Sequence, residues 1–168
     1  MDFKYCPHCG TKTVLKEIGD EGMVPWCDTC KIPLFPMFPT CIIALAVDEE
    51  GDVAVLRQNY ISAQYHVLVS GYMKPGESAE ECAAREVEEE LGLKVSKVHM
   101  TGTYWFEKKG MLMVGFLAKV NKLDFHLSTE VDQAVWVRPE EALDLLAPYP
   151  AISNLVTDYY MKHPHALD

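Results

Sequence analysis

The sequence predicts an α+β protein: a mixed sheet flanked by helices, preceded by a small four-cysteine zinc ribbon. Three observations indicate this class, namely two C-x2-C pairs near the N-terminus, apolar runs of strand length separated by turn residues, and three segments with helical spacing of apolar residues. The chain has 168 residues, 49% of them hydrophobic, which suits one globular domain with a small addition. The strand and helix segments alternate without long parallel crossovers, which favours a mixed sandwich.

The charge of the chain restricts its partners. Fifteen Lys and Arg stand against 25 Asp and Glu, giving a net charge of −10. Such a surface repels phosphate backbones and disfavours nucleic acid as a partner, and a phosphorylated ligand would need divalent cations beside it. No apolar run reaches the roughly 18 residues of a membrane span, and the N-terminus lacks a secretion signal. We therefore expect no membrane partner and a cytoplasmic location.

Four of the six cysteines form two knuckle pairs, Cys6 with Cys9 and Cys27 with Cys30. A C-x2-C pair brings two sulfurs to one side of a tight turn, and two such pairs complete a tetrahedron around Zn²⁺. Two disulfides or four unrelated thiols are the alternatives, and disulfides suit a cytosolic chain poorly. The spacing favours a structural zinc site.

A proline-rich connector follows these cysteines. Pro33, Pro36 and Pro39 define a stiff extended segment that cannot be helical. We therefore expect a zinc ribbon over residues 1–36 and a second domain over residues 37–168. Within the second domain, apolar runs bounded by turn residues predict strands at 41–47, 53–56, 65–69, 95–106, 111–120 and 134–137.

Three segments have helical patterning, at residues 79–91, 139–146 and 152–161. The first begins after Ser78, a good N-cap that forms a capping box with Glu81, and it ends at Gly92. The last places five apolar side chains on one face, which would either cover the domain's own core or form the seam of a homodimer: Ile152, Leu155, Val156, Tyr159 and Tyr160.

The first of these helices carries the clearest chemical signal. Glu86, Glu89 and Glu90 are spaced i, i+3 and i+4, so their carboxylates fall on one face of the helix. Such carboxylates repel one another, and a hard cation such as Mg²⁺ or Mn²⁺ relieves the repulsion because it prefers oxygen ligands. A solvated acidic face is the plainer interpretation of the same spacing.

The whole pattern around this helix decides between the two interpretations. It fits G-x5-E-x7-R-E-U-x-E-E-x-G-U, with U aliphatic, at Gly71, Glu77, Arg85, Glu86, Val87, Glu89, Glu90, Gly92 and Leu93. The chain therefore resembles a Nudix hydrolase. The resemblance implies an α/β/α sandwich and a metal-dependent pyrophosphohydrolase, which cleaves a nucleoside diphosphate linked to another moiety by water attack on phosphorus.

The resemblance also implies roles for individual residues. Glu86, Glu89 and Glu90 would bind catalytic Mg²⁺ or Mn²⁺ together with the backbone carbonyl of Gly71. Glu89 would also, or instead, act as general base. Arg85 directly precedes Glu86 in the motif and belongs to its catalytic residues. Together with Glu77, it resembles the salt bridge that orients the helix in this family.

A second resemblance concerns the order of segments. A four-cysteine ribbon, a proline-rich connector and then this motif are similar to the NADH pyrophosphatase subgroup. The segment Glu130-Val-Asp-Gln-Ala-Val-Trp is similar to the subgroup's stretch with one more metal-binding glutamate, so Glu130 is a further candidate ligand; a plain loop carboxylate is the alternative.

The chain lacks the S-Q-P-W-P-F-P-x-S segment of that subgroup. Residues 103–111 stand in its place and read T-Y-W-F-E-K-K-G-M. Tyr104, Trp105 and Phe106 could stack on a base or could be ordinary strand residues. The substrate therefore stays open among NADH, NAD, ADP-ribose and similar nucleotide conjugates.

Rival classes are a catalytically weak nucleotide sensor and an interaction module. A degenerate sensor is expected to lose some carboxylates of the motif, and all of them are present. The ribbon also lacks an excess of basic residues that would indicate nucleic-acid binding. The sequence favours an enzyme.

Overall fold

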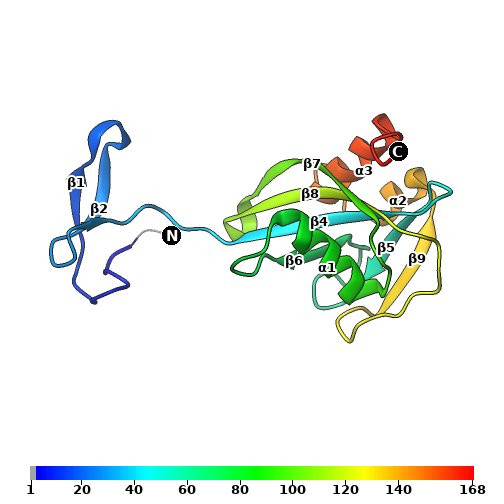
Figure 1. The fold of residues 1–168 in the computed structure, drawn as a ribbon, viewed down its shortest axis with the longest axis horizontal. Coiled ribbons are helices and arrows are strands. Elements are labelled where there is room, and N and C mark those ends of the chain that lie inside the picture. Colours follow the sequence, from blue (N-terminus) through cyan, green and yellow to red (C-terminus); the bar gives the residue numbers. More distant parts are fainter. Residues whose placement is uncertain (1–2) are drawn as a thin grey trace. The chain divides into compact units, whose positions relative to one another are not determined.

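A computed structural model describes residues 3–168, and its chain divides into two compact units with a boundary between Phe38 and Pro39 (Figure 1). The N-terminal unit contains an antiparallel sheet of three strands, β1 (Val14–Glu17), β2 (Met23–Cys27) and β3 (Ile32–Pro33). A 3-10 turn, η1 (Gly19–Glu21), connects the first two strands. Few of its apolar side chains are buried, namely Cys6, Val24, Cys27 and Leu34. A core of this size needs additional support to hold the fold.

The second unit is built on a mixed six-stranded sheet. Its strands are β4 (Thr40–Val47), β5 (Val53–Arg57), β6 (Val69–Tyr72), β7 (Lys97–Phe106), β8 (Met111–Lys119) and β9 (Gln133–Val137). The order is β7-β8-β4-β5-β9, and β6 pairs with β4. The central pair, β4 with β8, is parallel, and the other pairs are antiparallel. The short 3-10 turn η2 (Glu107–Lys109) closes the hairpin of β7 and β8.

One predicted strand is displaced. The sequence places a strand at residues 65–69, whereas β6 begins at Val69 and ends at Tyr72. Residues 65–68 form only isolated bridges, such as the one between Leu56 and Val67. Ser70 and Gly71 have weak strand propensity, but they pair with β4 along a continuous register. Pairing with a central strand outweighs local propensity, and propensity alone misses this result.

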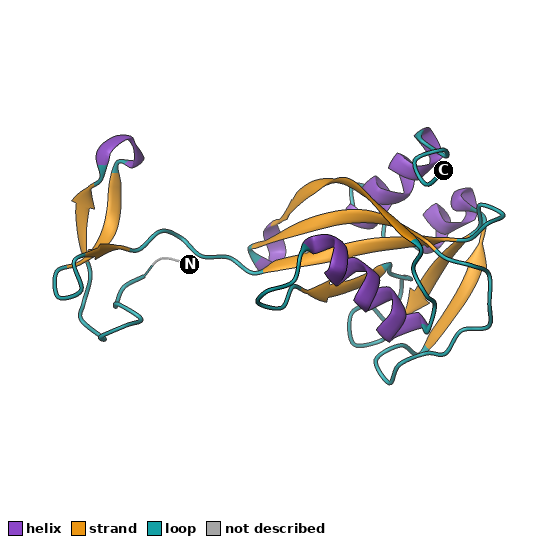
Figure 2. Ribbon diagram, viewed as in Figure 1, coloured by secondary structure: helices purple, strands orange, loops and turns teal. Residues whose placement is uncertain are grey.

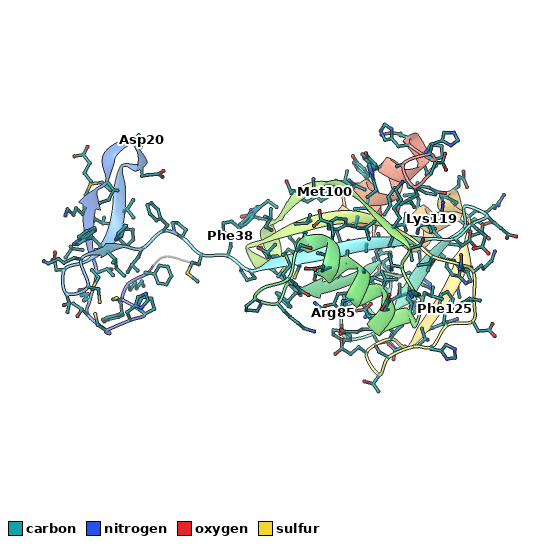
Figure 3. The ribbon with its side chains drawn as sticks, in the orientation of Figure 1. Asp20, Phe38, Arg85, Met100, Lys119 and Phe125 are labelled. Carbon is teal, nitrogen blue, oxygen red and sulfur yellow. The ribbon has the colours of Figure 1, made fainter. Side chains whose placement is uncertain are left out.

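Helices cover both faces of the sheet (Figures 1 and 2). Helix α1 (Ala79–Leu91) packs on one face, above β4, β6 and β8, while α2 (Pro139–Leu145) and α3 (Ile152–Lys162) lie on the other. Alternation along β4 separates the two cores, because Ile42 and Ala44 face α1 whereas Ile43 and Leu45 face α3. Side chains fill the space on both sides of the sheet (Figure 3). This layering confirms the predicted fold class.

The apolar stripe of α3 serves the protein's own core. Val156 and Tyr160 are buried beneath the sheet, and Ile152 and Tyr159 pack against them, whereas Leu155 lies outside this cluster. The structure therefore assigns most of the stripe to the core-covering alternative. Among the described residues, no helix combines the length and apolar character that crossing a membrane requires.

Candidate functional site

The candidate site is organised by the N-terminal end of α1. The Ser78 side chain accepts a hydrogen bond from the Glu81 backbone N–H at 3.2 Å, and the Glu81 carboxylate accepts from the Ser78 N–H at 2.8 Å. Gly92 adopts the left-handed conformation, with φ of 69°, and ends the helix. The predicted capping box and stop are confirmed. They fix the rotation of α1 and hence the face that presents its carboxylates.

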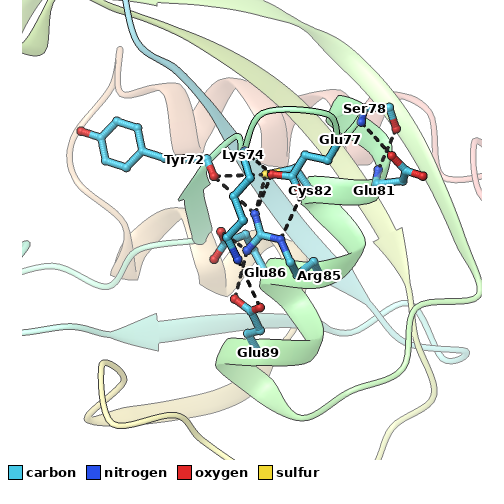
Figure 4. A network of polar contacts seen from close by, with 9 residues as sticks. All are labelled: Tyr72, Lys74, Glu77, Ser78, Glu81, Cys82, Arg85, Glu86 and Glu89. Carbon is cyan, nitrogen blue, oxygen red and sulfur yellow. Dashed lines mark hydrogen bonds and ion pairs between the residues drawn. The ribbon is translucent and has the colours of Figure 1, made fainter.

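Arg85 is the centre of the polar network on α1 (Figure 4). Its guanidinium forms a two-pronged pair with the Glu77 carboxylate, at 3.0 Å from Nε and 2.8 Å from Nη2. Nη1 also donates to Glu86 at 2.6 Å and to Glu89 at 3.0 Å, and Nη2 donates to the Tyr72 carbonyl at 3.3 Å. Arg85 therefore ties the loop before α1, the helix itself and strand β6 together.

The pKa of Glu77 reflects this network. Hydrogen bonds from Arg85 and from the Lys74 backbone N–H lower the pKa of Glu77 to about 2. Hydrogen bonds to Glu77 act in the other direction on Arg85 and raise the pKa of its guanidinium. Both groups are thus held in their charged forms throughout the physiological range. This behaviour is typical of a structural ion pair rather than of a proton donor or acceptor.

Gly71 and Glu86 make a close approach. A Cβ atom on Gly71 would lie 2.0 Å from the Glu86 Cδ and 2.1 Å from its Oε1, so the Glu86 carboxylate would have to move. The Glu86 carboxylate therefore lies directly over the backbone of β6. A larger residue at position 71 would displace the Glu86 carboxylate, so glycine here preserves the position of that side chain.

Glu90 lies deepest among the carboxylates of α1, with only 4% of its surface exposed. Within the described part of the chain, its Oε2 has no hydrogen-bond partner. Burial raises the pKa of Glu90 to about 7, the negative charges of Glu86, Glu130 and Glu89 act in the same direction, and the nearby Gln58 amide opposes them. A bound cation would reverse this shift and would satisfy the free oxygen, so the residue fits a divalent metal.

The loop that carries Glu130 is tied to this region at both ends. The Ser128 backbone N–H donates to the Glu90 carbonyl at 3.2 Å. On the other side, the Asp132 carboxylate accepts a hydrogen bond from the Asn59 backbone N–H at 2.7 Å. Glu130 is consequently held close enough to Glu90 to act on its pKa. The structure thus brings together two glutamates that stand 40 positions apart in the sequence.

An open cleft of about 430 Å³ lies beside this loop, lined by Asn59, Tyr60, Thr129, Glu130 and Asp132. Desolvation by its neighbours raises the pKa of Tyr60, although 68% of its surface is exposed, and the negative charges of Glu130, Glu90 and Glu86 raise it further. The phenol therefore stands within the electrostatic field of the same carboxylates. The cleft gives an extended ligand access to their edge.

The carboxylates of α1 do not converge on a single point. Among the described residues, only two groups place three or more potential ligand atoms within 4.8 Å of one another, and neither includes Glu86, Glu89 or Glu90. Arg85 forms ion pairs with Glu86 and Glu89. Mutual repulsion separates such like charges where no cation lies between them. The donors themselves, carboxylate oxygens beside an approachable backbone, suit Mg²⁺ or Mn²⁺.

A second acidic group lies in the turn after β4. Asp48, Glu50 and Asp52 surround the Lys122 ammonium, whose Nζ lies 3.4, 3.1 and 2.6 Å from their carboxylates. Hydrogen bonding to these groups, first to Asp52, raises the pKa of Lys122. The lysine balances the negative charge of the three carboxylates, so we interpret this cluster as a structural ion-pair network rather than as a candidate metal site.

The four cysteines of the N-terminal unit do converge. Their sulfurs all lie within 4.8 Å of one another, with Cys6 Sγ 3.9 Å from Cys30 Sγ and Cys9 Sγ 3.5 Å from Cys27 Sγ. A tetrahedral zinc site with Zn–S bonds of ~2.3 Å separates its sulfurs by ~3.8 Å. Hydrogen bonds with Thr11 lower the pKa of Cys9 to about 6, whereas hydrogen bonding with Cys9 raises the pKa of Cys30 to about 12, so neighbouring sulfurs share the negative charge. The cysteines are free of disulfides, and their geometry fits zinc.

The three aromatic candidates on β7 separate between the two faces of the sheet. Tyr104 and Phe106 pack partly buried against the core beneath α3. The Trp105 side chain is 51% exposed. Trp105 pairs with Leu112 of β8, and Leu112 lies on the same face of the sheet as Val114, which packs against α1. Of the three, Trp105 is therefore the one on the carboxylate side of the sheet.

Sequence reasoning missed Gln58 and Tyr60. Both follow β5 directly, in a turn that the motif does not include. A single polar residue after a strand has no periodicity and no partner that is visible in the sequence. Only the fold reveals that this turn borders Glu90 and Glu130.

Comparison with known proteins agrees with this geometry. A family model described as "NUDIX domain" matches residues 37–158. The chain is 33% identical over 151 residues to Nudix hydrolase 19, chloroplastic, of Arabidopsis thaliana, covering 86% of this chain and 34% of that protein. It is 27% identical over 155 residues to the NAD-capped RNA hydrolase NudC of Photobacterium profundum, covering 92% and 56%.

The chain thus spans between about one third and just over half of the length of these relatives. Among solved structures, a NUDIX hydrolase from Nitrosomonas europaea superimposes with a TM-score of 0.71 at 21% identity. The superposition covers 97% of this chain and 93% of that one. At this identity the likeness shows a common fold.

Proposed function

The chain belongs to the Nudix family, and from that premise we propose that it hydrolyses the pyrophosphate of a nucleoside diphosphate linked to another moiety. The observation that carries the proposal is the arrangement around Glu90. Its buried carboxylate has a free oxygen within the described structure, and the Glu86 carboxylate, from the same helix, lies over Gly71. Both carboxylates are hard oxygen donors, and Glu130, whose charge acts on Glu90, lines the open cleft.

We assign the binding of Mg²⁺ or Mn²⁺ to five groups, listed here: the Gly71 carbonyl and the carboxylates of Glu86, Glu89, Glu90 and Glu130. When bound, the cation offsets phosphate charge, activates water and stabilises the leaving oxygen. Arg85 and Glu77 keep α1 in register with β6, as their charged pair indicates. Arg85 therefore contributes to catalysis by positioning Glu86 and Glu89.

The proposed step is a displacement at phosphorus. A water oxygen forms a bond to one phosphorus, the bridging P–O bond breaks, and the second phosphate leaves with the electron pair. Glu89 takes the proton of the attacking water, since it is the most exposed of the motif carboxylates, with 53% of its side chain accessible. The products are two phosphate monoesters.

For the substrate, we propose a dinucleotide of the NAD type, either free or at the end of a longer molecule. Several relatives are named NAD-capped RNA hydrolases, and this name is the basis of the proposal. The exposed face of Trp105 offers a stacking surface for a base on the α1 side of the sheet. Tyr104 and Phe106 would then support the strand from its other face.

The N-terminal cysteines complete the proposal. We assign one structural Zn²⁺ to Cys6, Cys9, Cys27 and Cys30, since their sulfurs already have the spacing of a tetrahedral site. A cytoplasmic location is consistent with six reduced cysteines. A homodimer is the assembly to test, and sedimentation velocity at two protein concentrations distinguishes it from a monomer.

Product analysis on a substrate panel tests the function. The panel contains NADH, NAD, ADP-ribose, an NAD-capped oligoribonucleotide and a dNTP, each with Mg²⁺ or Mn²⁺. We expect NAD-type substrates to give mononucleotide ends with the wild type and not with Glu90→Gln. The matched control, Glu88→Gln, lies on the exposed side of the same helix and should keep full activity. Binding of these ligands without any product would instead favour the nucleotide-sensor alternative.

A further inference from the structure

The open cleft beside the Glu130 loop has one aromatic wall. Tyr60 is the only aromatic residue among the described residues that line this cleft, and the others are polar or acidic, namely Asn59, Thr129, Glu130 and Asp132. Tyr60 is largely exposed, so its ring does not serve the core. Clefts that bind small molecules combine such an apolar face with a few polar groups, and the ring of Tyr60 therefore offers a surface on which a flat ligand can lie.

Hydrogen bonds hold the backbone on both sides of Tyr60. The Asn59 N–H donates to the Asp132 carboxylate at 2.7 Å, which ties the turn after β5 to the loop that carries Glu130. On the other side, the Ile61 N–H donates to a backbone carbonyl of the same turn at 2.8 Å. The backbone that carries Tyr60 is therefore already ordered, and a ligand that binds beside the ring has little ordering of this turn to offset.

The charge of the cleft favours a cationic ligand group over a phosphate. Its lining contains the carboxylates of Glu130 and Asp132 and, within the described part of the chain, no lysine or arginine. Glu130 is one of the groups that we assign to the divalent metal, whereas Asp132 is not, so its negative charge stays available to a ligand. A flat ring with a positive charge fits this cleft best, because a cation is attracted both to the face of a tyrosine and to a carboxylate.

The oxidised nicotinamide ring has this chemistry. It is planar and its ring nitrogen carries a positive charge, whereas the reduced nicotinamide of NADH and the adenine base are neutral. We propose that Tyr60 and Asp132 form the subsite for the oxidised nicotinamide ring and make the protein prefer NAD to NADH. This inference rests on the proposed function, because it assumes an NAD-type substrate whose pyrophosphate is cleaved beside Glu130. Tyr60 and Asp132 then determine specificity by touching the substrate away from the reacting phosphorus.

Steady-state kinetics with NAD and NADH tests the preference. For the full chain with zinc in its cysteine site and saturating Mg²⁺, we expect a KM for NAD about 2- to 5-fold below that for NADH, as one cation at an exposed aromatic face produces. Tyr60→Leu should raise the KM for NAD about 10-fold with little change in kcat, and Tyr60→Phe, which keeps the ring, should recover most of that loss. Asp132→Asn keeps an acceptor for the Asn59 N–H and should remove the difference between NAD and NADH.

Ring compounds without phosphate test the subsite without metal or turnover. The N1-methylnicotinamide cation carries the charged ring, and nicotinamide is its neutral counterpart. In nuclear magnetic resonance titrations of the ¹⁵N-labelled chain, we expect the cation to shift the backbone amide signals of Asn59 and Tyr60 and to bind about 2- to 5-fold more tightly than nicotinamide. Tyr60→Leu and Asp132→Asn should each weaken this binding. Asp144→Asn removes one negative charge on α2, outside the cleft lining, and is the matched control.

The two measurements separate the inference from the proposed function. Cleavage of both dinucleotides with equal KM values would overturn the inference and leave the hydrolase proposal intact. A fall in kcat of Tyr60→Leu at unchanged KM would show a structural role of Tyr60 and would also overturn it. If neither dinucleotide is cleaved, the proposed substrate fails and the titration decides: selective binding of the cation at Tyr60 supports the subsite, and unshifted signals of Asn59 and Tyr60 exclude it.

Discussion

The two candidate metal sites of this protein are built differently. In the N-terminal unit, the four sulfurs lie within 4.8 Å of one another, as a tetrahedral site requires. On α1, the carboxylates share a helix face, but Arg85 holds two of them and the third is buried beneath them. Knuckle turns bring sulfurs together through local backbone geometry, whereas a helix face only aligns carboxylates that then repel each other. The first site is therefore largely preformed, and the second depends on its cation.

The largest effect is expected from breaking the preformed site. Cys27→Ser should remove zinc from the chain and unfold residues 3–38, because the buried core of this unit is very small. Structural zinc in comparable small sites contributes about 10–16 kcal/mol of apparent binding free energy. Elemental analysis should find one zinc per wild-type chain and none in the variant, and hydrogen exchange should rise at Val24. Cys41→Ala, which lies in β4, should retain its zinc; a wild-type protein with four free thiols and no metal would contradict the account.

The second effect concerns the carboxylates that depend on a cation. Glu89→Gln should reduce turnover roughly 10³-fold at saturating Mg²⁺, because it removes a metal ligand and proton acceptor together. The melting temperature should stay close to that of the wild type, since half of this side chain is already exposed. Steady-state kinetics beside Glu88→Gln provides the measurement. A near-normal rate in Glu89→Gln would remove this residue from the catalytic set.

Gly71→Ala tests the close approach without changing any charge. The added Cβ would overlap the Glu86 carboxylate, so that carboxylate must move. Displacing a catalytic group by about 1 Å costs on the order of 10²-fold in rate. We expect Gly71→Ala to resemble Glu86→Gln in its requirement for more Mg²⁺, measured as the half-saturating metal concentration. An unchanged metal requirement would show that the Gly71–Glu86 contact does not define the site.

The smallest effect concerns pH and the Arg85 network. Because the folded-state pKa of Glu77 is lowered to about 2 from its ordinary value near 4.5, its ion pair stabilises the fold fully above that ordinary value. This contribution is lost as the pH falls from about 4.5 toward 2. Urea unfolding should therefore show Glu77→Gln less stable than the wild type at pH 7, with the gap shrinking at pH 3. Glu80→Gln, on the exposed first turn of α1, is the control, and a pH-independent gap would contradict the role of the ion pair.

Local signals of the sequence predicted much of this structure. The capping box at Ser78 and the stop at Gly92 follow from short-range spacing, and the structure confirms them. The displaced strand β6 does not follow, because its pairing partner β4 lies almost 30 positions earlier. Lys122 among the acids of the 48–52 turn is missed for the same reason. Contacts between distant residues are what sequence patterns alone do not reveal.

For the candidate site, too, the sequence predicted some residues and only the folded structure revealed others. Spacing identified the glutamates of α1, and the resemblance added Glu130 and the Gly71 carbonyl. The buried Gln58 and the Tyr60 side of the cleft came only from the folded structure. The aromatic run at 104–106 shows the limit of patterning most clearly, because strand alternation separates Trp105 from Tyr104 and Phe106.

Hydrolysis in ¹⁸O-labelled water shows whether water attacks phosphorus with the help of the divalent metal and Glu90. The substrate is the one that the panel shows to be cleaved best, and mass spectrometry follows the label in both products. We expect one ¹⁸O atom in the phosphate of a single product, formed with Mg²⁺ or Mn²⁺ and absent with Glu90→Gln. Cleavage that proceeds equally without divalent metal, or equally with Glu90→Gln, would contradict this expectation.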